Sequence, residues 1–243
     1  KLLILLPAAL ALSEFLPAAI TPLLMLGGLY LCFEGAEKVL EKLGGEKHGD
    51  TLADPIEDMA AFERERISGA IRTDFILSAE IVAIALAEVS GEPLLSRAII
   101  LALVAVVITV LVYGAVALIV KMDDAGLHMA QRADAGSRAL GRFLLRAMPK
   151  LLAVLSVIGT LAMLWVGGGI MLHGAHELGL HKPSDLAHAV QHAVELASGP
   201  LGGALGWLTY AVLSAVVGLA LGATVALVVH WVQKVTALGK GAN

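Results

Sequence analysis

The stretch AIILALVAVVITVLVYGAVALIV, residues 98–120, decides the fold class, because 23 consecutive residues carry no charged side chain. About 20 apolar residues in a helix cross the hydrocarbon core of a bilayer. The rest of the chain agrees: of its 243 residues 58% are hydrophobic and only 16% charged, and its mean hydropathy is +0.84. A water-soluble domain holds fewer apolar residues than this. We therefore predict an all-α, polytopic transmembrane helical bundle in contact with a lipid bilayer.

Outward from this stretch, prolines, glycines and charges divide the chain into about six apolar segments. The predicted spans cover residues 2–20, 22–37, 74–90, 97–120, 149–172 and 201–232 of a single integral membrane domain. The connectors 38–72 and 121–148 are polar, and the segment 173–200 is rich in histidine. Within the first connector we expect a charged helix at 55–71. Because the chain starts with Lys1 rather than Met, we also expect a natural N-terminal extension before the first span.

The basic residues are distributed unevenly over the two faces of this topology. With Lys1 on the cytoplasmic side, only Arg97 and Lys182 of the 17 Lys and Arg residues fall on the other face. The positive-inside rule therefore predicts a multi-pass protein with both termini of this chain in the cytoplasm. The net charge of -4 excludes a nucleic-acid binder, which needs a basic surface. The single cysteine, Cys32, excludes an internal disulfide.

The predicted span 74–90 carries acidic residues inside an apolar helix. A carboxylate at the bilayer centre costs about 2.5–3.5 kcal/mol on insertion scales, and such residues are usually functional. Glu80 lies well inside this helix, and its alternative role is a buried carboxyl paired with a group such as Arg72. Asp74 shares a helical face with Ser78, and its alternative role is a helix start at the interface. We predict that Asp74, Ser78 and Glu80 contribute to binding or transport.

A second pair of acids, Glu34 and Glu37, lies at the end of the second predicted span. The two residues are three positions apart and share a helical face, so together they can bind a hard cation or share a proton. The alternative is a solvated helix exit, since Lys38 and Glu41 follow directly.

Histidines are concentrated in the segment 173–200. Imidazoles three or four positions apart on one helix can bind zinc or another transition metal. The candidate metal ligands are His173, His176, His188 and His192, and a divalent metal ion is the corresponding cofactor. His188 and His192 belong to a helix predicted to start near Ser184. The alternative is that the polar stripe of this helix only contacts water. The spacing from His176 to His181 is one residue too long for the H-E-x-x-H zinc motif.

Two apolar segments resemble each other and run in opposite directions through the predicted membrane. Residues 22–37 read PLLMLGGLYLCFEGAE, and residues 161–176 read LAMLWVGGGIMLHGAH. The identical positions are Gly28/Gly167, Gly35/Gly174 and Ala36/Ala175. Opposed copies of one element place a transport site near the bilayer midplane in inverted-repeat transporters. The alternative is chance likeness between glycine-rich apolar helices. If the repeat is real, Glu34 and His173 occupy equivalent positions.

The remaining glycines indicate close helix packing. Gly202 and Gly206, like Gly218 and Gly222, are four residues apart, which lets helices approach closely in lipid. The same faces allow a homo-oligomer. We also expect packing roles for Gly27, Gly28 and the run at 167–169.

Three stretches resemble a known family: ITPLLMLGGLYLCFEGAEKVL (20–40), RTDFILSAEIVAIAL (72–86) and GGGIMLHGAHEL (167–178). Together they resemble the YedI-like family of bacterial inner-membrane proteins, the domain of unknown function 808, over the whole chain. The resemblance implies a multi-span protein of the bacterial inner membrane and no established activity. DFILSAEI (74–81) is more faintly similar to the acidic motif of TerC-type metal exporters. That family has an Asp-Asn pair where this chain has Glu80 and Ile81.

The leading hypothesis is a transporter or exporter of a small cation, either a divalent metal ion or a proton coupled to a solute. The alternative is a non-transporting membrane scaffold that binds anionic lipid through Arg132, Arg138, Arg142 and Arg146. We do not expect an enzyme, because the sequence has neither a G-x-S-x-G elbow nor a Walker glycine loop.

Overall fold

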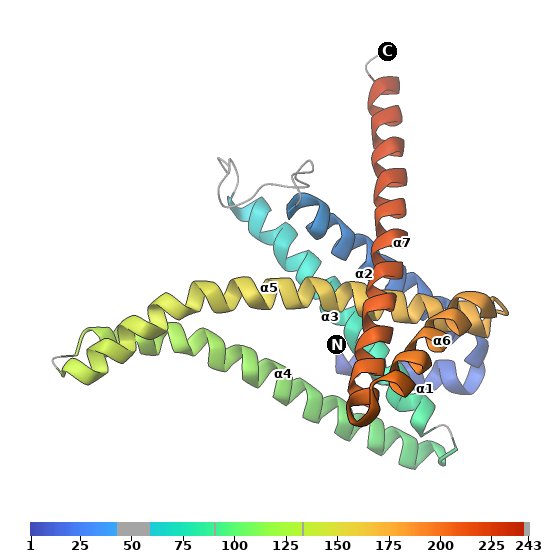
Figure 1. Ribbon diagram of the computed structural model, residues 1–243, viewed down its shortest axis with the longest axis horizontal. Coiled ribbons are helices and arrows are strands. Elements are labelled where there is room, and N and C mark those ends of the chain that lie inside the picture. Colours follow the sequence, from blue (N-terminus) through green and yellow to red (C-terminus); the bar gives the residue numbers. More distant parts are fainter. Residues whose placement is uncertain (43–58, 90, 133, 241–243) are drawn as a thin grey trace. The chain divides into compact units, whose positions relative to one another are not determined.

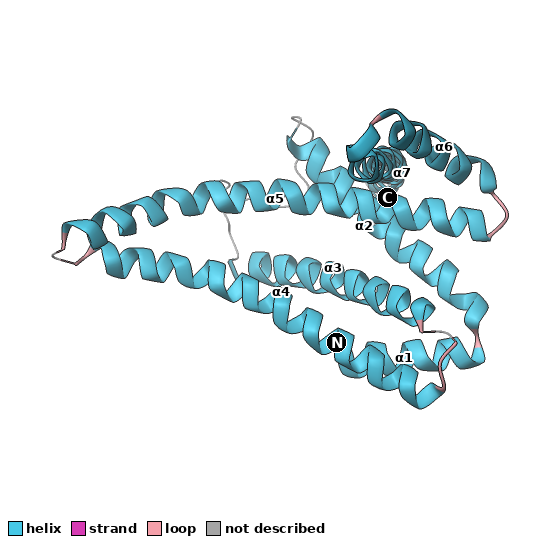
Figure 2. Cartoon of the chain, turned by 60° about the horizontal axis from the view of Figure 1, so that its bottom comes forward, coloured by secondary structure: helices cyan, strands magenta, loops and turns pink. Residues whose placement is uncertain are grey.

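The computed structural model describes residues 1–42, 59–89, 91–132 and 134–240, and every regular element in these ranges is a helix (Figure 2). The elements are α1 (Leu2–Phe15), η1 (Pro17–Ala19), α2 (Ile20–Lys42), α3 (Met59–Glu88), α4 (Leu94–Ala130), α5 (Ala135–Glu177), α6 (His181–Ala197), η2 (Gly199–Leu201) and α7 (Gly202–Lys240) (Figure 1). The predicted all-α helical class is confirmed.

Several helical segments are long and apolar enough to cross a membrane. Four such segments lie within the described residues, at Pro17–Lys42, Leu94–Ala130, Ala135–Glu177 and Gly199–Val232. Large apolar side chains cover their outer surfaces, and Leu103, Leu111 and Leu118 of α4 are each 66% exposed. A soluble monomer rarely shows apolar surface on this scale, whereas lipid tails cover it without cost. The helices therefore fit an integral membrane protein.

Two of the predicted spans correspond to helices outside this set. The 14 residues of α1 extend about 21 Å at 1.5 Å per residue, less than the roughly 30 Å of a bilayer core. The predicted helix at 55–71 and the predicted span at 74–90 form one continuous helix, α3, from Met59 onward. Residues 55–58 of that prediction lie outside the described residues. Ser68 and Gly69 lie where the charged first half of α3 meets its apolar second half, and the helix continues through both residues.

The break between the first two helices differs from the expected position at Thr21–Pro22. The first helix ends at Phe15, and Leu16 has an extended φ of -144° before Pro17. The proline ring disfavours helical backbone at the preceding residue, which explains the break at Leu16. Pro22 lies in the first turn of α2, where its missing N–H costs no helical hydrogen bond.

Residues 91–93 connect α3 to α4, and Ser90 lies outside the described residues. The connector 121–148 is largely helical, because α4 continues to Ala130 and α5 begins at Ala135. Asp134 caps the new helix: its Oδ2 accepts a 2.8 Å hydrogen bond from the Ser137 backbone N–H. α6 begins at His181, three residues before the expected start near Ser184.

The helices form two compact units made of alternating segments of the chain. One unit comprises residues 1–11 and 81–159, and the other comprises 12–80 and 160–243. In the first unit, α4 packs closely against the start of α5 at two glycines. A Cβ on Gly141 would overlap Ala130 and lie 2.6 Å from the carbonyl oxygen of Gly126. This contact requires that no side chain be present.

The second unit has a three-helix core formed by α2, the end of α5, and α7, while α6 packs along α7 (Figure 1). The Cys32 side chain lies fully buried at the crossing. A Cβ on Gly167 would lie 2.8 Å from Cys32 Sγ, and one on Gly222 would overlap the Cys32 carbonyl. Gly168 contacts Ser214 of α7 in the same manner. The predicted packing role of these glycines is confirmed.

The two Gly-x-x-x-Gly pairs of α7 also contact helices of the same chain. Gly202 and Gly206 lie against Glu195 of α6, and Gly218 lies against Leu164 of α5. Close approach of helix backbones through small residues gives van der Waals contact that lipid cannot supply. These glycine faces are therefore covered within one copy of the chain.

Candidate functional site

The two copies of the sequence repeat pack against each other as antiparallel helices, α2 and the end of α5. A Cβ on Gly35 would lie 2.9 Å from Leu164 Cδ2, and one on Gly174 would overlap Met25. Gly35 is equivalent to Gly174 in the repeat, and Met25 is equivalent to Leu164. The same contact therefore occurs twice, once in each direction, as expected if the predicted inverted repeat is real.

At one end of this helix pair, five side chains from α2 and α3 form what we call the Glu34 cluster: Tyr30, Glu34, Lys38, Arg72 and Thr73. Glu34 accepts hydrogen bonds from Lys38 Nζ at 2.8 Å and from Thr73 Oγ1 at 2.6 Å. The Tyr30 hydroxyl interacts with both Glu34 and Arg72. Tyr30, Glu34 and Lys38 recur every four residues, so they lie on one stripe of α2. The cluster thus joins an acid that is only 18% exposed to a base and two hydroxyls.

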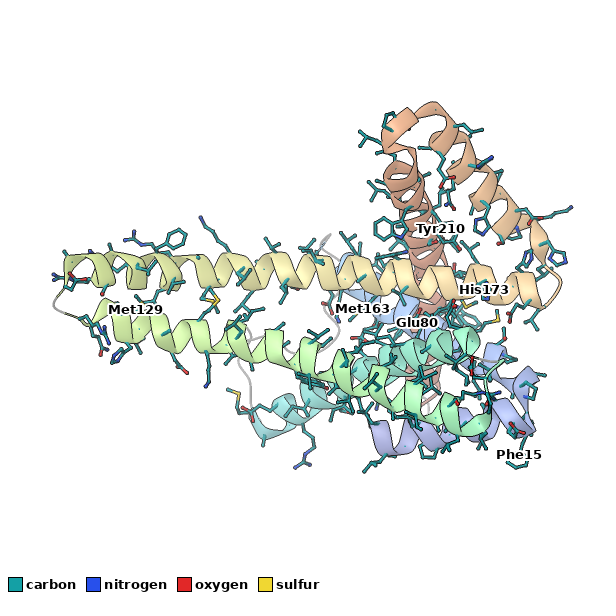
Figure 3. The ribbon with its side chains drawn as sticks, turned by 90° about the horizontal axis from the view of Figure 1, so that it is seen from below. Phe15, Glu80, Met129, Met163, His173 and Tyr210 are labelled. Carbon is teal, nitrogen blue, oxygen red and sulfur yellow. The ribbon has the colours of Figure 1, made fainter. Side chains whose placement is uncertain are left out.

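The Glu34 cluster extends to α5 through Lys38. Its Nζ lies 3.6 Å from the sulfur of Met163, which Figure 3 shows on α5. Glu37, which was predicted to act with Glu34, is half-buried on α2. Sequence reasoning placed Lys38 in a solvated exit turn, but the structure makes it the counter-ion of Glu34.

At the opposite end of the helix pair lies a smaller set, the Glu177 cluster: Thr21, His173 and Glu177. Glu177 Oε2 accepts a hydrogen bond from Thr21 Oγ1 of α2, and Glu177 Oε1 lies 3.3 Å from His173 Nε2. His173 is seen near the end of α5 in Figure 3. Thr21 and Glu34 are about 20 Å apart along α2, at roughly 1.5 Å per residue.

The two clusters occupy equivalent positions of the repeat. His173 corresponds to Glu34, and Glu177 corresponds to Lys38, so each end carries an acid–base pair four residues apart on its helix. The order of acid and base is reversed between the ends. In each cluster the carboxylate also accepts a hydrogen bond from a threonine of another helix. Glu34 and His173, which occupy equivalent positions of the predicted repeat, are thus at opposite ends of the α2–α5 contact.

The three predicted residues of α3 lie along the helix at different positions around its axis. Thr73 contacts Glu34, and Ile76 lies 3.0 Å from the Cβ position of Gly27, so this stripe of α3 faces α2. Glu80 follows Ile76 by one turn and continues the same stripe. Asp74 and Ser78 lie beside that stripe and are half-buried.

Glu80 is an acid inside an apolar helix for which the described residues supply no partner. Its side chain is half-buried, and it forms no hydrogen bond or ion pair with another residue that the structure describes. The alternative partner suggested by the sequence, Arg72, interacts with Tyr30 instead. Figure 3 shows Glu80 on α3. Glu80 thus places a carboxylate without a described partner on the stripe of α3 that faces α2, within the apolar half of the helix.

The histidines of the segment 173–200 fall into separate contacts. His188 stacks on Tyr210 of α7, with ring centroids 4.9 Å apart and planes at 17°. His192 Nδ1 lies 3.5 Å from Glu195 Oε2. Within the described ranges, no group of three or more His, Cys, Asp or Glu side chains is arranged to hold a metal ion. A metal role for His173, His176, His188 and His192 stays a prediction.

The corner between α5 and α6 brings together three residues that the sequence left apart or unremarked. The Nδ1 atoms of His176 and His181 are 3.3 Å apart, and their rings meet edge to face with centroids 4.5 Å apart. Asp185 Oδ1 lies 3.8 Å from His176 Nδ1. Gly179, between the two histidines, was the sequence signal for this corner, since glycine commonly ends a helix.

Comparison with known proteins assigns the chain to one family. A family model described as "Protein of unknown function (DUF808)" matches residues 1–228. No curated protein and no solved structure matches the chain. The resemblance drawn from the three sequence stretches is thereby confirmed, whereas the fainter likeness to TerC-type exporters is not shown.

Proposed function

Since this chain belongs to the DUF808 family of proteins of unknown function, we propose its function from its own residues. It is an inner-membrane transporter that moves a small cation, either a divalent metal ion or a proton coupled to a solute, on carboxylates inside the helical bundle. Both termini of the chain face the cytoplasm in this proposal, as the distribution of Lys and Arg predicts.

Glu80 carries the proposal. A carboxylate in the apolar part of a membrane helix costs about 2.5–3.5 kcal/mol unless something charged meets it. Glu80 is half-buried, and no described residue supplies a hydrogen bond or a positive charge to it. Its stripe of α3 faces α2, the helix that carries one cluster at each end. A transported cation is the partner that this side chain lacks.

The two end clusters support a path along α2. The Glu34 cluster and the Glu177 cluster occupy equivalent positions in opposed copies of one repeat. In inverted-repeat transporters the substrate site lies between such copies, and each end opens in turn. At the Glu34 end, Lys38 occupies the carboxylate at 2.8 Å, so a cation arriving there competes with the lysine ammonium. Asp74 and Ser78 provide further oxygen ligands on α3.

The second candidate function, a membrane scaffold, is supported by one surface. Arg138, Arg142, Arg146 and Lys150 recur every four residues and are all exposed on α5, which suits anionic headgroups. Its other support is weaker, because the glycine pairs of α7 already pack against α5 and α6. No enzymatic activity is proposed.

The test is flux through the purified full chain reconstituted into liposomes that enclose a metal-sensitive or a pH-sensitive dye. We expect cation flux in the wild type, and at least a tenfold lower rate for Glu80→Gln, which keeps the shape of the side chain but removes its charge. Glu88→Gln is the matched control, because Glu88 is an exposed acid at the end of the same helix. Its flux should equal that of the wild type.

A second readout uses cells. Glu80→Gln and Asp74→Asn should change metal accumulation and metal tolerance relative to the wild type. If both variants leave accumulation, tolerance and liposome flux unchanged, the transport proposal is wrong, and the scaffold function becomes the better account.

A further inference from the structure

The end of α5 is shaped by Gly179, whose φ of +93° is a conformation that favours glycine. The Leu180 N–H donates to the Ala175 carbonyl at 2.8 Å, and the Gly179 N–H donates to the His176 carbonyl at 3.0 Å. This pair of bonds is the Schellman motif, which ends a helix and reverses the chain. α6 then begins at His181.

The reversal makes neighbours of two histidines that a continuous helix would separate. Five positions on one helix correspond to a rotation of about 500°, so the two rings would point in different directions. In the structure, His176 lies in the last turn of α5 and His181 is the first residue of α6. Their Nδ1 atoms are 3.3 Å apart. The H-E-x-x-H motif was rejected because His176 and His181 are one residue too far apart on a single helix. That reason does not apply here, because the two residues lie on different helices.

The spacing of these atoms is the spacing of two ligands on one metal. Zinc binds histidine nitrogen at about 2.0–2.1 Å in tetrahedral geometry, which puts two ligand atoms roughly 3.4 Å apart. Asp185 lies four residues after His181 on the same face of α6, and its Oδ1 is 3.8 Å from His176 Nδ1. That distance exceeds the ligand spacing, so the three side chains as they stand do not form a metal site. Asp185 is 64% exposed, and metal binding here requires its side chain to turn toward the two histidines.

We propose that His176, His181 and Asp185 bind one transition-metal ion, with zinc the best-suited, at the corner between α5 and α6. The donor set, two imidazoles and one carboxylate, is a familiar one for zinc with an open fourth position for water. The site goes beyond the proposed transport function, because a metal bound here links two helix ends and needs no flux. The alternative, without a metal ion, is a hydrogen bond between the two imidazoles, in which one ring donates and the other accepts.

The experiment titrates the purified full chain in detergent with Co²⁺, whose visible absorption reports tetrahedral coordination, and then displaces it with Zn²⁺. The wild type should bind one Co²⁺ per chain. His176→Ala and His181→Ala should each weaken binding at least tenfold, and Asp185→Asn should weaken it less. His128→Ala is the matched control, since His128 is an exposed histidine of α4 that belongs to no candidate site. Its Co²⁺ affinity should equal that of the wild type.

A ligand exchange separates loss of a ligand from loss of the fold. His181→Cys keeps a donor at the same position, so it should retain Co²⁺ and add a thiolate-to-cobalt absorption band. Cys32 is fully buried and does not contribute that band. The proposal is overturned if the wild type binds Co²⁺ no better than the His176→Ala/His181→Ala double variant, or if His128→Ala loses binding equally. Cation flux that persists in the double variant would leave the transport proposal standing, so the two proposals fail separately.

Discussion

The carboxylate of Glu34 accepts a 2.6 Å hydrogen bond from the hydroxyl of Thr73, and this bond joins α2 to α3. Thr73 is only 7% exposed, so water does not replace it readily. Thr73 Oγ1 also lies 3.1 Å from the Gly69 carbonyl of its own helix. A single hydroxyl therefore links the α3 backbone to the acid at the centre of the Glu34 cluster.

Thr73→Val tests that link. Valine keeps the shape of the side chain but removes the donor, which leaves a poorly hydrated carboxylate short of one hydrogen bond, at a cost of about 1–3 kcal/mol. The measurement is chemical unfolding of the purified chain in detergent, followed by circular dichroism. The control is Thr224→Val, because Thr224 is exposed and bonds only its own helix, at the Ala220 carbonyl. Equal stability of the two variants would contradict the prediction.

A double-mutant cycle measures the coupling between Glu34 and Lys38. Lys38→Gln removes the counter-ion from a carboxylate that is 18% exposed, so it should destabilise the chain more than Lys38→Gln in a Glu34→Gln background. Because the lysine is 40% exposed, solvent screens the pair, and we expect a coupling of about 1 kcal/mol. A coupling near zero would mean that the contact makes no contribution.

Gly168→Ala tests the core of the second unit. A Cβ at this position would overlap the carbonyl oxygen of Ser214, and a helix backbone cannot yield as a side chain does. We expect a loss of roughly 3 kcal/mol or more, at the upper end of what overpacking costs. The control is Gly159→Ala in the same helix, where no atom lies within 4 Å. Alanine there should be neutral, or stabilising by about 0.5–1 kcal/mol.

The cap of α5 predicts a pH dependence. Hydrogen bonds from the backbone and side chain of Ser137 lower the pKa of Asp134 below its usual value. A carboxyl with a lowered pKa in the folded state stabilises the fold above its unfolded pKa, and that stabilisation is lost as pH falls through the folded pKa. The protection of the Ser137 amide from hydrogen exchange should therefore decrease at acid pH.

Two variants of Asp134 separate the cap from its charge. Asp134→Ala should lose protection at the start of α5 at neutral pH as well. Asp134→Asn should keep most of the cap, because asparagine is also a good N-cap, but without the dependence on pH. Protection that is independent of pH in the wild type would contradict the assigned role of the ionised carboxylate.

Much of the fold could be predicted from composition and spacing, but the helix boundaries less well. The uncharged stretch 98–120 predicted a membrane helix, and it lies within α4. The connector 121–148 separates α4 from α5, and most of it is helical. At Leu16 the effect of the following proline decided the break, whereas the first predicted span continued to residue 20.

The candidate site could be predicted only in part. Glu80 and Glu34 stood out because an acid among apolar residues is conspicuous in any sequence. Thr73, Tyr30 and Glu177 were not predicted, because a hydroxyl or an exit-turn acid becomes informative only when its partner is known.

The sequence by itself determined the helical class, the association with a membrane and the glycines at which helices pack closely. These properties follow from residue type and spacing along one segment, since hydrophobicity and side-chain volume act locally. Only the tertiary structure decided that Lys38 pairs with Glu34, that no described residue pairs with Glu80, and that His176 and His181 meet. Those facts depend on where each helix ends and on which helices pack together. Packing brings residues that are distant in the sequence next to each other, so their charges cannot be paired from the sequence alone.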